Sequence, residues 1–396
     1  MRPGATESVP LDDSLGRTLA VPIVSNMAVP PFANSAMDGY ALRSTDTAAG
    51  SQYIDSSTAR VSLRVAREIQ AGSLDSGAIG PGHTARIMTG APMPEGADSV
   101  VPFEEVILDG PSISITPEIQ TGACVRPAGL DIKPGDIVLD VGSMMGPRQI
   151  ALAASIGAAS VQVYRRPVVA ILATGDELVE PGQRLRPGQI YNSNAHGLAA
   201  AVRELGAVPQ MVAPGTDEPE SIRAALNSIS SVDLILSSGG VSVGDFDFVK
   251  QVIGEAGRVD FWRICMRPGK PLMFGEVPVG DGTNVMILGL PGNPTSTMVT
   301  FYVFARPVLL NLSGRSNPLW EPLRAITQDA LDNHGGRETY FRVRLETEAG
   351  RLIATLSGGQ DSSMLLPLSR ATGLARVAAN VERVEPGESV DVFPLP

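Results

Sequence analysis

Hydrophobic and polar positions follow different patterns along the chain, and these patterns divide it into segments. Between residues 165 and 317, continuous apolar runs alternate with amphipathic segments, which predicts strands followed by helices. Within residues 51–125 and beyond residue 318, the apolar runs are short and are separated by Gly and Pro clusters, which is typical of β domains. The chain is therefore predicted to combine an α/β domain with two β-rich domains.

The segment between residues 165 and 317 repeats a strand, a glycine-containing loop and a helix. The predicted strands are 168–173, 208–212, 234–236, 261–266 and 285–288. The predicted helices are 195–205, 219–229, one beginning at Phe248 and one that follows the turn at 289–294 and reaches Leu312. Strands that alternate with helical crossovers form a doubly wound parallel sheet.

The remaining segments contribute shorter elements. Leu11, Leu15 and Leu19 are four residues apart, which predicts a short helix over 8–20. Further predicted elements are a strand at 136–141, a helix at 147–156, and strands at 160–164, 61–65, 99–103 and 340–345. Together with the α/β segment, these elements indicate four domains.

Composition narrows the class of protein. A chain of 396 residues exceeds what one hydrophobic core usually serves, and a net charge of −11 argues against a nucleic-acid or anionic-membrane partner. The two cysteines, Cys124 and Cys265, are too few for a disulfide framework or a zinc site. The first residues lack an apolar export signal, and the apolar region 298–312 is too short to span a bilayer. We therefore expect a soluble cytoplasmic protein.

Charged residues follow several of the predicted strands. They are Asp176 and Glu177, Asp217, Asp245 and Asp247, and Arg267 and Lys270. The ends of parallel strands share one edge of a sheet, so these groups are predicted to converge on one crevice. Carboxylates suit Mg²⁺, and the two cations suit a phosphate or oxyanion. Taken singly, each residue also has a structural interpretation, such as a helix cap for Asp217 or a side chain lying over apolar surface for Lys270.

The stretch 232–250 contains the pair Gly239-Gly240 between a strand and a helix. Alone it indicates only a tight turn, because it lacks both the phosphate-loop lysine and the dinucleotide fingerprint. Its serines have no histidine nearby in sequence, which excludes a serine-nucleophile mechanism. Asp38, Thr89 and Asp131 lie in other loops as candidate site residues, although Asp38 is equally consistent with an Asx-turn.

Several stretches, taken together and in order, resemble the molybdopterin molybdenumtransferases, the family of bacterial MoeA proteins and the E domain of gephyrin. They are PPFANSAMDGYA (30–41), MTGAP (88–92), Arg126 with Gly129 and Asp131, TGDEL (174–178), SSGGVSVG (237–244), PGKP (268–271) and LPGNP (290–294). The resemblance covers nearly the whole chain. It departs from the family pattern at Ala33, where an aspartate is usual, and at Arg267, where a lysine is common.

The resemblance implies an elongated homodimer with the active cleft between subunits. It implies a discontinuous N-terminal linking domain (1–25 and 136–164), a β-rich inserted domain (26–135), an α/β substrate-binding domain (165–317) and a C-terminal β domain (318–396). The implied reaction inserts molybdate into adenylylated molybdopterin, with Mg²⁺-dependent release of AMP. The substrates would then be molybdate and the adenylylated pterin, with no nucleic-acid or membrane partner.

The resemblance also implies roles for individual residues. The implied catalytic residues are Asp38, Thr89, Asp131, Glu177, Asp217 and Asp247, of which Glu177, Asp217 and Asp247 would hold the metal. The implied pterin or nucleotide contacts are Gly239, Gly240, Val241 and Ser242. The implied molybdate-binding residues are Arg267, Lys270, Pro291, Pro294, Arg337 and Ser362.

Two other functions fit parts of the same sequence. The gephyrin E domain also clusters receptors, so a scaffold is one alternative, although this chain lacks the extra domain and long linker of such a scaffold. A different phosphotransfer enzyme that uses residues 165–315 alone is another. This second alternative predicts that Asp38, Thr89 and Asp131 are dispensable for activity.

Overall fold

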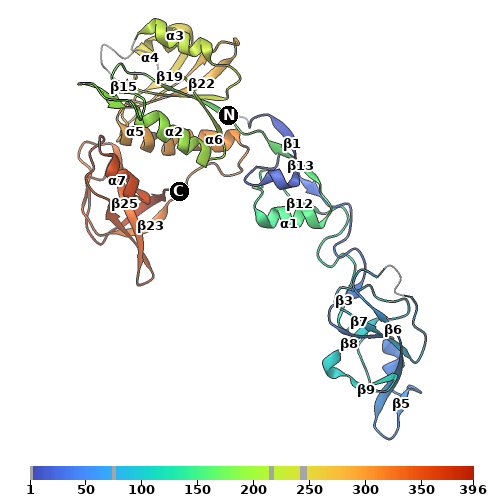
Figure 1. Ribbon diagram of the computed structural model, residues 1–396. Helices are drawn as coiled ribbons and strands as arrows, with labels where there is room; N and C mark the ends of the chain where they lie inside the picture. The colour runs from blue at the N-terminus through green and yellow to red at the C-terminus, as the bar shows by residue number, and fades with distance from the viewer. Residues whose placement is uncertain (1–2, 74–76, 214–217, 241–247) are drawn as a thin grey trace.

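The computed structural model describes residues 3–73, 77–213, 218–240 and 248–396. The molecule is elongated, with the α/β and C-terminal domains at one end and the β-rich inserted domain at the other (Figure 1). Strand β1 (Thr6–Pro10) pairs with β13 (Ser160–Tyr164), and β2 (Ile23–Val24) pairs with β12 (Ile137–Leu139). The linking domain is therefore built from two separate parts of the chain, and the predicted fold class is confirmed.

The helix predicted over 8–20 is wrong. Residues 6–10 form β1, and only the short 3₁₀ turn η1 (Leu11–Ser14) follows it. Pro10 has extended backbone angles and Gly16 has a φ of +74°, so neither end of this segment continues as a helix. Leu15 is 58% exposed, whereas Leu11 and Leu19 are buried against helix α1 (Pro147–Ser155) and its neighbours. The regular leucine spacing therefore does not mark one helical face.

The inserted domain is a sheet with the strand order β8-β4-β7-β6-β10-β9, and β5 pairs with β6. Its strands are β4 (Gly39–Leu42), β5 (Ile54–Asp55), β6 (Arg60–Ile69), β7 (His83–Ile87), β8 (Ser99–Pro102), β9 (Ile107–Asp109) and β10 (Ser112–Ile115). A separate two-stranded pair, β3 (Asn34–Ser35) and β11 (Val125–Arg126), flanks these strands in the sequence. Because β4 pairs with β7, the residue before β4 faces the residues after β7.

The α/β domain contains a six-stranded sheet in the order β17-β14-β18-β22-β21-β19. Its strands are β14 (Val168–Ala173), β17 (Val208–Met211), β18 (Leu234–Ser238), β19 (Arg258–Trp262), β21 (Met273–Pro278) and β22 (Asn284–Leu290). The first four strands in the order are parallel to one another, and β21 is antiparallel to both β22 and β19. The sheet is thus mixed rather than wholly parallel, but β19 still runs in the direction of β22.

Helices cover both faces of this sheet, which makes it doubly wound (Figure 1). One face carries α2 (Ser193–Glu204), α5 (Pro294–Thr300), the π-helical turn η4 (Phe301–Ala305) and α6 (Arg306–Leu312). The other face carries α3 (Pro219–Ser228) and α4 (Phe248–Ala256). The strand predicted at 261–266 is right only for its first two residues: β19 ends at Trp262, Arg263 has a φ of +82°, and the chain leaves the sheet.

The C-terminal domain is a closed set of strands, because β25 pairs with β27 as well as with β26. Its main strands are β23 (Leu323–Thr327), β25 (Glu338–Glu348), β26 (Arg351–Leu356), β27 (Gly373–Val377) and β29 (Ser389–Pro394), with helix α7 (Leu365–Arg370) beside them. Strand β20 (Met266–Arg267), which follows β19, pairs in parallel with β25. Backbone pairing therefore joins the α/β and C-terminal domains.

Over the described residues, none of the helices has the length and apolar character needed to cross a membrane.

Candidate functional site

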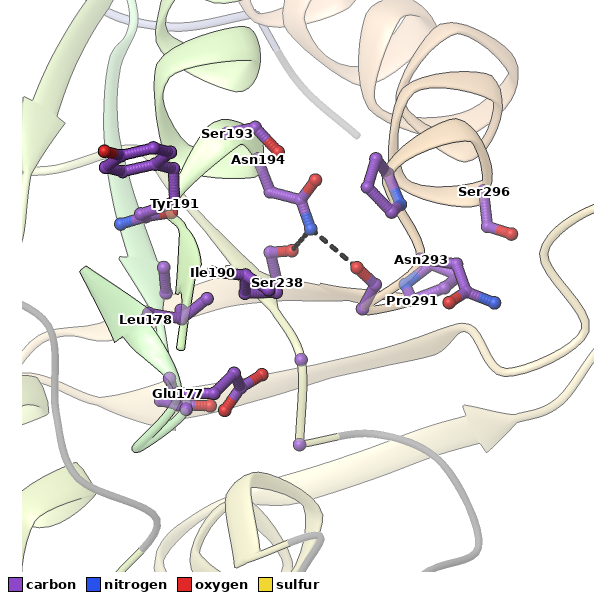
Figure 2. A pocket seen from close by; sticks show the side chains of 18 of the residues that line it. Glu177, Leu178, Ile190, Tyr191, Ser193, Asn194, Ser238, Pro291, Asn293 and Ser296 are labelled. Carbon is purple, nitrogen blue, oxygen red and sulfur yellow. Dashed lines mark hydrogen bonds between the residues drawn. The ribbon is translucent and has the colours of Figure 1, made fainter. Parts of the chain in front are cut away.

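A large pocket, about 620 Å³, lies at the carboxyl ends of β14, β18 and β22. Its walls come from the loop after β14, the glycines after β18, the turn before α5, and the short paired strands β15 (Leu178–Val179) and β16 (Ile190–Tyr191). Figure 2 shows these side chains around the opening, with Glu177 and Leu178 on one side and Pro291 and Asn293 on the other. Strand ends of an α/β sheet are where ligands bind, so this pocket corresponds to the predicted crevice.

Asn194 holds two walls of the pocket together, and the sequence analysis did not single it out. Its Nδ2 donates to Ser238 Oγ at 2.9 Å and to the carbonyl oxygen of Gly292 at 2.7 Å (Figure 2). Asn192 positions this side chain, because its Oδ1 accepts from the backbone N–H of Ala195 and caps α2. The sequence offered one signal for Asn194: it lies in the first turn of a helix that Asn192 caps.

Two hydroxyl groups beside the glycine turn are buried and have no hydrogen-bond partner within the described residues. They are Thr174 Oγ1 and Ser237 Oγ. Thr174 is 5% exposed and lines the larger pocket, next to Gly239 and Gly240. A buried hydroxyl without a partner is unusual, and here it adds an oxygen with free hydrogen-bonding capacity at the pocket wall.

The glycines of this turn are required by the backbone. Gly239 and Gly240 have φ angles of +95° and +68°, and a Cβ on Gly240 would lie 2.4 Å from Val249 Cγ2. The predicted contacts Val241 and Ser242 follow this turn and lie outside the described residues, as do the predicted metal ligands Asp217 and Asp247. The described part of the predicted glycine loop therefore lines the pocket through Gly239 and Gly240.

Glu177 is the described member of the predicted metal set. It is exposed in the loop after β14, and Figure 2 shows its carboxylate on the wall of the larger pocket. Its backbone carbonyl accepts from the N–H of Ile190 at 2.9 Å, which fixes the loop against β16. Within the described residues, no three His, Cys, Asp or Glu side chains gather as a metal-binding group.

A smaller pocket, about 260 Å³, collects positive charge between the α/β and C-terminal domains. The predicted residues that line it are Arg267, Lys270, Arg337 and Ser362. Pro291 and Pro294 line the larger pocket instead. Pro271, Asn293 and Ser296 line both pockets, so the two spaces adjoin. Asp361 also lines the smaller pocket, and hydrogen bonds from Ser363 lower the pKa of its carboxyl, with the charges of Arg342 and Arg267 adding to this effect.

Asp38 and Thr89 come together in the inserted domain. The backbone N–H and Oγ1 of Thr89 donate to Asp38 Oδ1 at 2.6 and 2.7 Å, and these bonds lower the pKa of the Asp38 carboxyl. Asp131 lies in another loop, where its backbone N–H donates to the carbonyl oxygen of Val29 at 3.0 Å. The inserted domain lies far from the α/β domain of the same chain (Figure 1), so these residues do not share a pocket with Glu177 within one chain.

The fold is that of a multidomain protein in which an α/β domain presents a large pocket next to a cationic one, an arrangement typical of ligand-binding proteins. The MoeA N-terminal region (domain I and II) matches residues 2–157, the probable molybdopterin binding domain matches 170–311, and the MoeA C-terminal region (domain IV) matches 324–395. The chain belongs to the molybdopterin molybdenumtransferase (MoeA) family. This membership confirms the predicted family and the predicted enzyme class, a transferase.

Individual relatives are similar to this chain over nearly its full length. The chain is 37% identical to the molybdopterin molybdenumtransferase of Nostoc sp., covering 99% of this chain and 89% of the relative, and 35% identical to that of Haemophilus influenzae, covering 99% and 95%. Among solved structures, a molybdopterin biosynthesis MoeA protein from Pyrococcus horikoshii is similar with a TM-score of 0.85 and 32% identity, covering 99% of this chain and 95% of that one. The similarity therefore extends to every domain.

Proposed function

We propose that this chain inserts molybdenum into molybdopterin in molybdenum cofactor biosynthesis, using an adenylylated pterin and molybdate and releasing AMP. The observation that carries the proposal is the adjacency of the two pockets through Pro271, Asn293 and Ser296. The larger pocket suits the pterin nucleotide, and the smaller one has the size and charge for an oxyanion. An anion and its acceptor held in adjoining pockets are positioned for transfer.

Arg267, Lys270 and Arg337 would bind molybdate in the smaller pocket. The chain carries a net charge of −11, so a dianion needs local cations of this kind to bind at all. Arginine offers several N–H donors in a fixed plane, and lysine offers a point charge, so the set can contact several oxyanion oxygens together. Asn293 and Ser362 add neutral hydrogen-bonding groups to the same wall.

Mg²⁺ fits the donor chemistry of the larger pocket, which offers carboxylate and hydroxyl oxygens at Glu177 and Thr174. We propose Glu177, together with Asp217 and Asp247, as its ligands. When bound, the ion would neutralise phosphate charge at the pterin nucleotide. The glycine turn at Gly239 and Gly240 would let the backbone come close to those phosphates.

We further propose a cytoplasmic homodimer in which the site is completed by the partner subunit. Asp38 and Thr89 lie in a domain remote from the pockets of their own chain (Figure 1). Large apolar side chains are exposed along the linking and inserted domains, among them Val21, Val24, Phe32, Met37, Leu130, Ile137, Val141 and Met144. Exposed apolar surface of this kind is typical of interfaces. Both cysteines are free, which agrees with a reducing compartment.

The reaction is tested by incubating the purified chain with adenylylated molybdopterin, molybdate and Mg²⁺. We expect AMP release, and we expect Lys270→Ala to reduce kcat/KM for molybdate while Arg370→Ala, an exposed cation outside both pockets, leaves it unchanged. A folded chain that leaves the nucleotide intact would refute the proposed activity. Release of AMP while the pterin remains free of molybdenum would refute the insertion step.

The shared site is tested by complementation between two variants. Asp38→Ala and Glu177→Ala would each be inactive alone, but a mixed dimer would contain one intact site out of two. Random pairing would then restore about a quarter of the wild-type activity. Full activity of Asp38→Ala by itself would instead support a phosphotransfer enzyme that uses residues 165–315 alone.

A further inference from the structure

Arg342, on strand β25, is the largest fully buried side chain among the described residues and is 1% exposed. Its Nη2 donates to the carbonyl oxygens of Gly359 at 3.0 Å and Asp361 at 3.2 Å. Its Nε is buried and has no hydrogen-bond partner within the described part of the chain. A buried guanidinium is costly unless it is compensated, so its retention at this position calls for a reason beyond packing.

The backbone of Arg342 contacts the same loop. Its N–H donates to Gln360 Oε1 at 2.9 Å, and its carbonyl oxygen accepts from Gln360 Nε2 at 3.2 Å and Ser357 Oγ at 3.0 Å. Main chain and side chain of one residue therefore fix the loop from Ser357 to Asp361. Several hydrogen bonds to one residue leave this loop little freedom.

The far end of the loop reaches the α/β domain. Asn293 Nδ2 donates to Ser362 Oγ at 3.0 Å, and the backbone N–H of Thr295 donates to the Ser362 carbonyl at 3.2 Å. Between these two anchors, Gln360, Asp361 and Ser362 form one wall of the smaller pocket. Arg342 is thus the buried support of a wall whose outer face lines the cationic pocket.

Arg342 also carries charge close to that pocket. Burial lowers the pKa of its guanidinium to about 10, while the charge of Asp361 raises it and that of Arg267 lowers it. The group therefore remains protonated at neutral pH. The effects of Asp361 and Arg267 on the pKa of Arg342 show that it lies within electrostatic reach of two residues that line the smaller pocket.

We infer that Arg342 is a positioning residue for oxyanion binding: it holds the loop 357–362 so that Ser362 and Gln360 face the pocket that contains Arg267, Lys270 and Arg337. This inference rests on the proposed function of that pocket as the molybdate site. Arg342 has no path to the ligand, because its side chain is buried behind the loop. It acts through the residues that it holds.

The test compares Arg342→Met, Arg342→Lys and Arg344→Met in the full chain. Arg344 lies two residues along the same strand and is exposed, which makes it the matched control. Molybdate affinity is measured by calorimetry, KM for adenylylated molybdopterin by AMP release, and folding by the melting temperature. We expect Arg342→Met to weaken molybdate binding about tenfold, which corresponds to about 1.4 kcal/mol. In Arg342→Met, KM for the pterin should stay within about twofold of wild type, far below that tenfold effect. In Arg344→Met, molybdate affinity and KM for the pterin should both stay within about twofold of wild type.

Arg342→Lys keeps the charge but loses the planar pair of donors, so its molybdate affinity should fall between those of wild type and Arg342→Met. If Arg342→Met does not fold, Arg342→Lys provides the test: it should weaken molybdate binding and leave KM for the pterin nearly unchanged. Unchanged molybdate affinity in the folded variants, or an equal loss for both substrates, would overturn the inference alone. Failure of the wild-type chain to bind molybdate would overturn the proposed function and the inference together.

Discussion

Replacing Asn194 by alanine should loosen the junction between the glycine turn and the turn before α5. The side chain donates two hydrogen bonds, to Ser238 Oγ and to the carbonyl of Gly292, from a single Nδ2 atom. Alanine removes both bonds and leaves the helix cap at Asn192 in place.

The magnitude follows from the surroundings of the two acceptors. A neutral hydrogen bond contributes about 0.5–1.5 kcal/mol net, and the loss is greater where the abandoned group is buried. Ser238 is 3% exposed, so water replaces its lost donor less readily than at Gly292, which is exposed. We therefore expect local opening of these turns to become easier by about 2 kcal/mol, which is roughly a 30-fold change in the opening equilibrium.

Local hydrogen exchange is the appropriate assay, because a chain of several domains does not unfold in a single two-state step. The amide of Gly239, bonded to the Leu290 carbonyl, and that of Thr297, bonded to the Asn293 carbonyl, report on the two walls. Both should exchange roughly 30-fold faster in Asn194→Ala. The control is Asn227→Ala, whose side chain is exposed on α3 across the sheet.

Unchanged exchange at both amides in Asn194→Ala, or the same increase in Asn227→Ala, would refute the reasoning. Either result would mean that the walls are held by packing rather than by this side chain. AMP release provides a second measurement, since a wall that opens more readily should raise KM for the adenylylated pterin with a smaller effect on KM for molybdate.

Three further predictions concern other parts of the molecule. Gly269→Ala should lower oxyanion affinity and stability, because φ is +109° and the new Cβ would lie 2.3 Å from Thr300 Cγ2; calorimetry and thermal melting measure the two effects. Thr89→Ala should raise the pKa of Asp38 toward its ordinary value, whereas the pKa of Asp55, lowered by its bonds to Ser57, should stay unchanged in an NMR titration. Because a depressed carboxyl pKa contributes stability above the unfolded pKa and loses it as pH falls through the folded value, the melting temperature of wild type should approach that of the variant on acidification. Asp233→Ala removes the bonds from Arg165 and the Val168 N–H, and should speed exchange of the Val168 amide by at least tenfold, or about 1.4 kcal/mol.

The repeating strand and helix pattern was predictable because its strands are buried on both faces. The predicted strand 168–173 matches β14, and the continuous apolar run 234–236 lies in β18 at the centre of the sheet. The segment 8–20 was not predictable from leucine spacing, since that spacing fits a strand, a turn and a loop as well as a helix. There, Pro10 and Gly16 override the periodic pattern.

The site was predictable only where charge or glycine follows a strand. Asn194 was missed because its role depends on two partners distant in sequence, Ser238 and Gly292. Arg342 was missed for a different reason: an alternating strand is expected to place an arginine outward, but β25 is buried on both faces over residues 339–343. A charged residue on the inner face of such a strand leaves no mark in the hydrophobic pattern.

The pairing of β20 with β25 sets the spacing of the cationic pocket. Met266 is opposite Glu338 and Arg267 is opposite Thr339, so the main chain itself fixes where Arg267 stands relative to Arg337. A slip of one residue would turn Arg267 to the other side of the strand. The register of β20 against β25 thus sets the separation of the backbone positions that carry Arg267 and Arg337. Either position could carry arginine or lysine without a change in that separation.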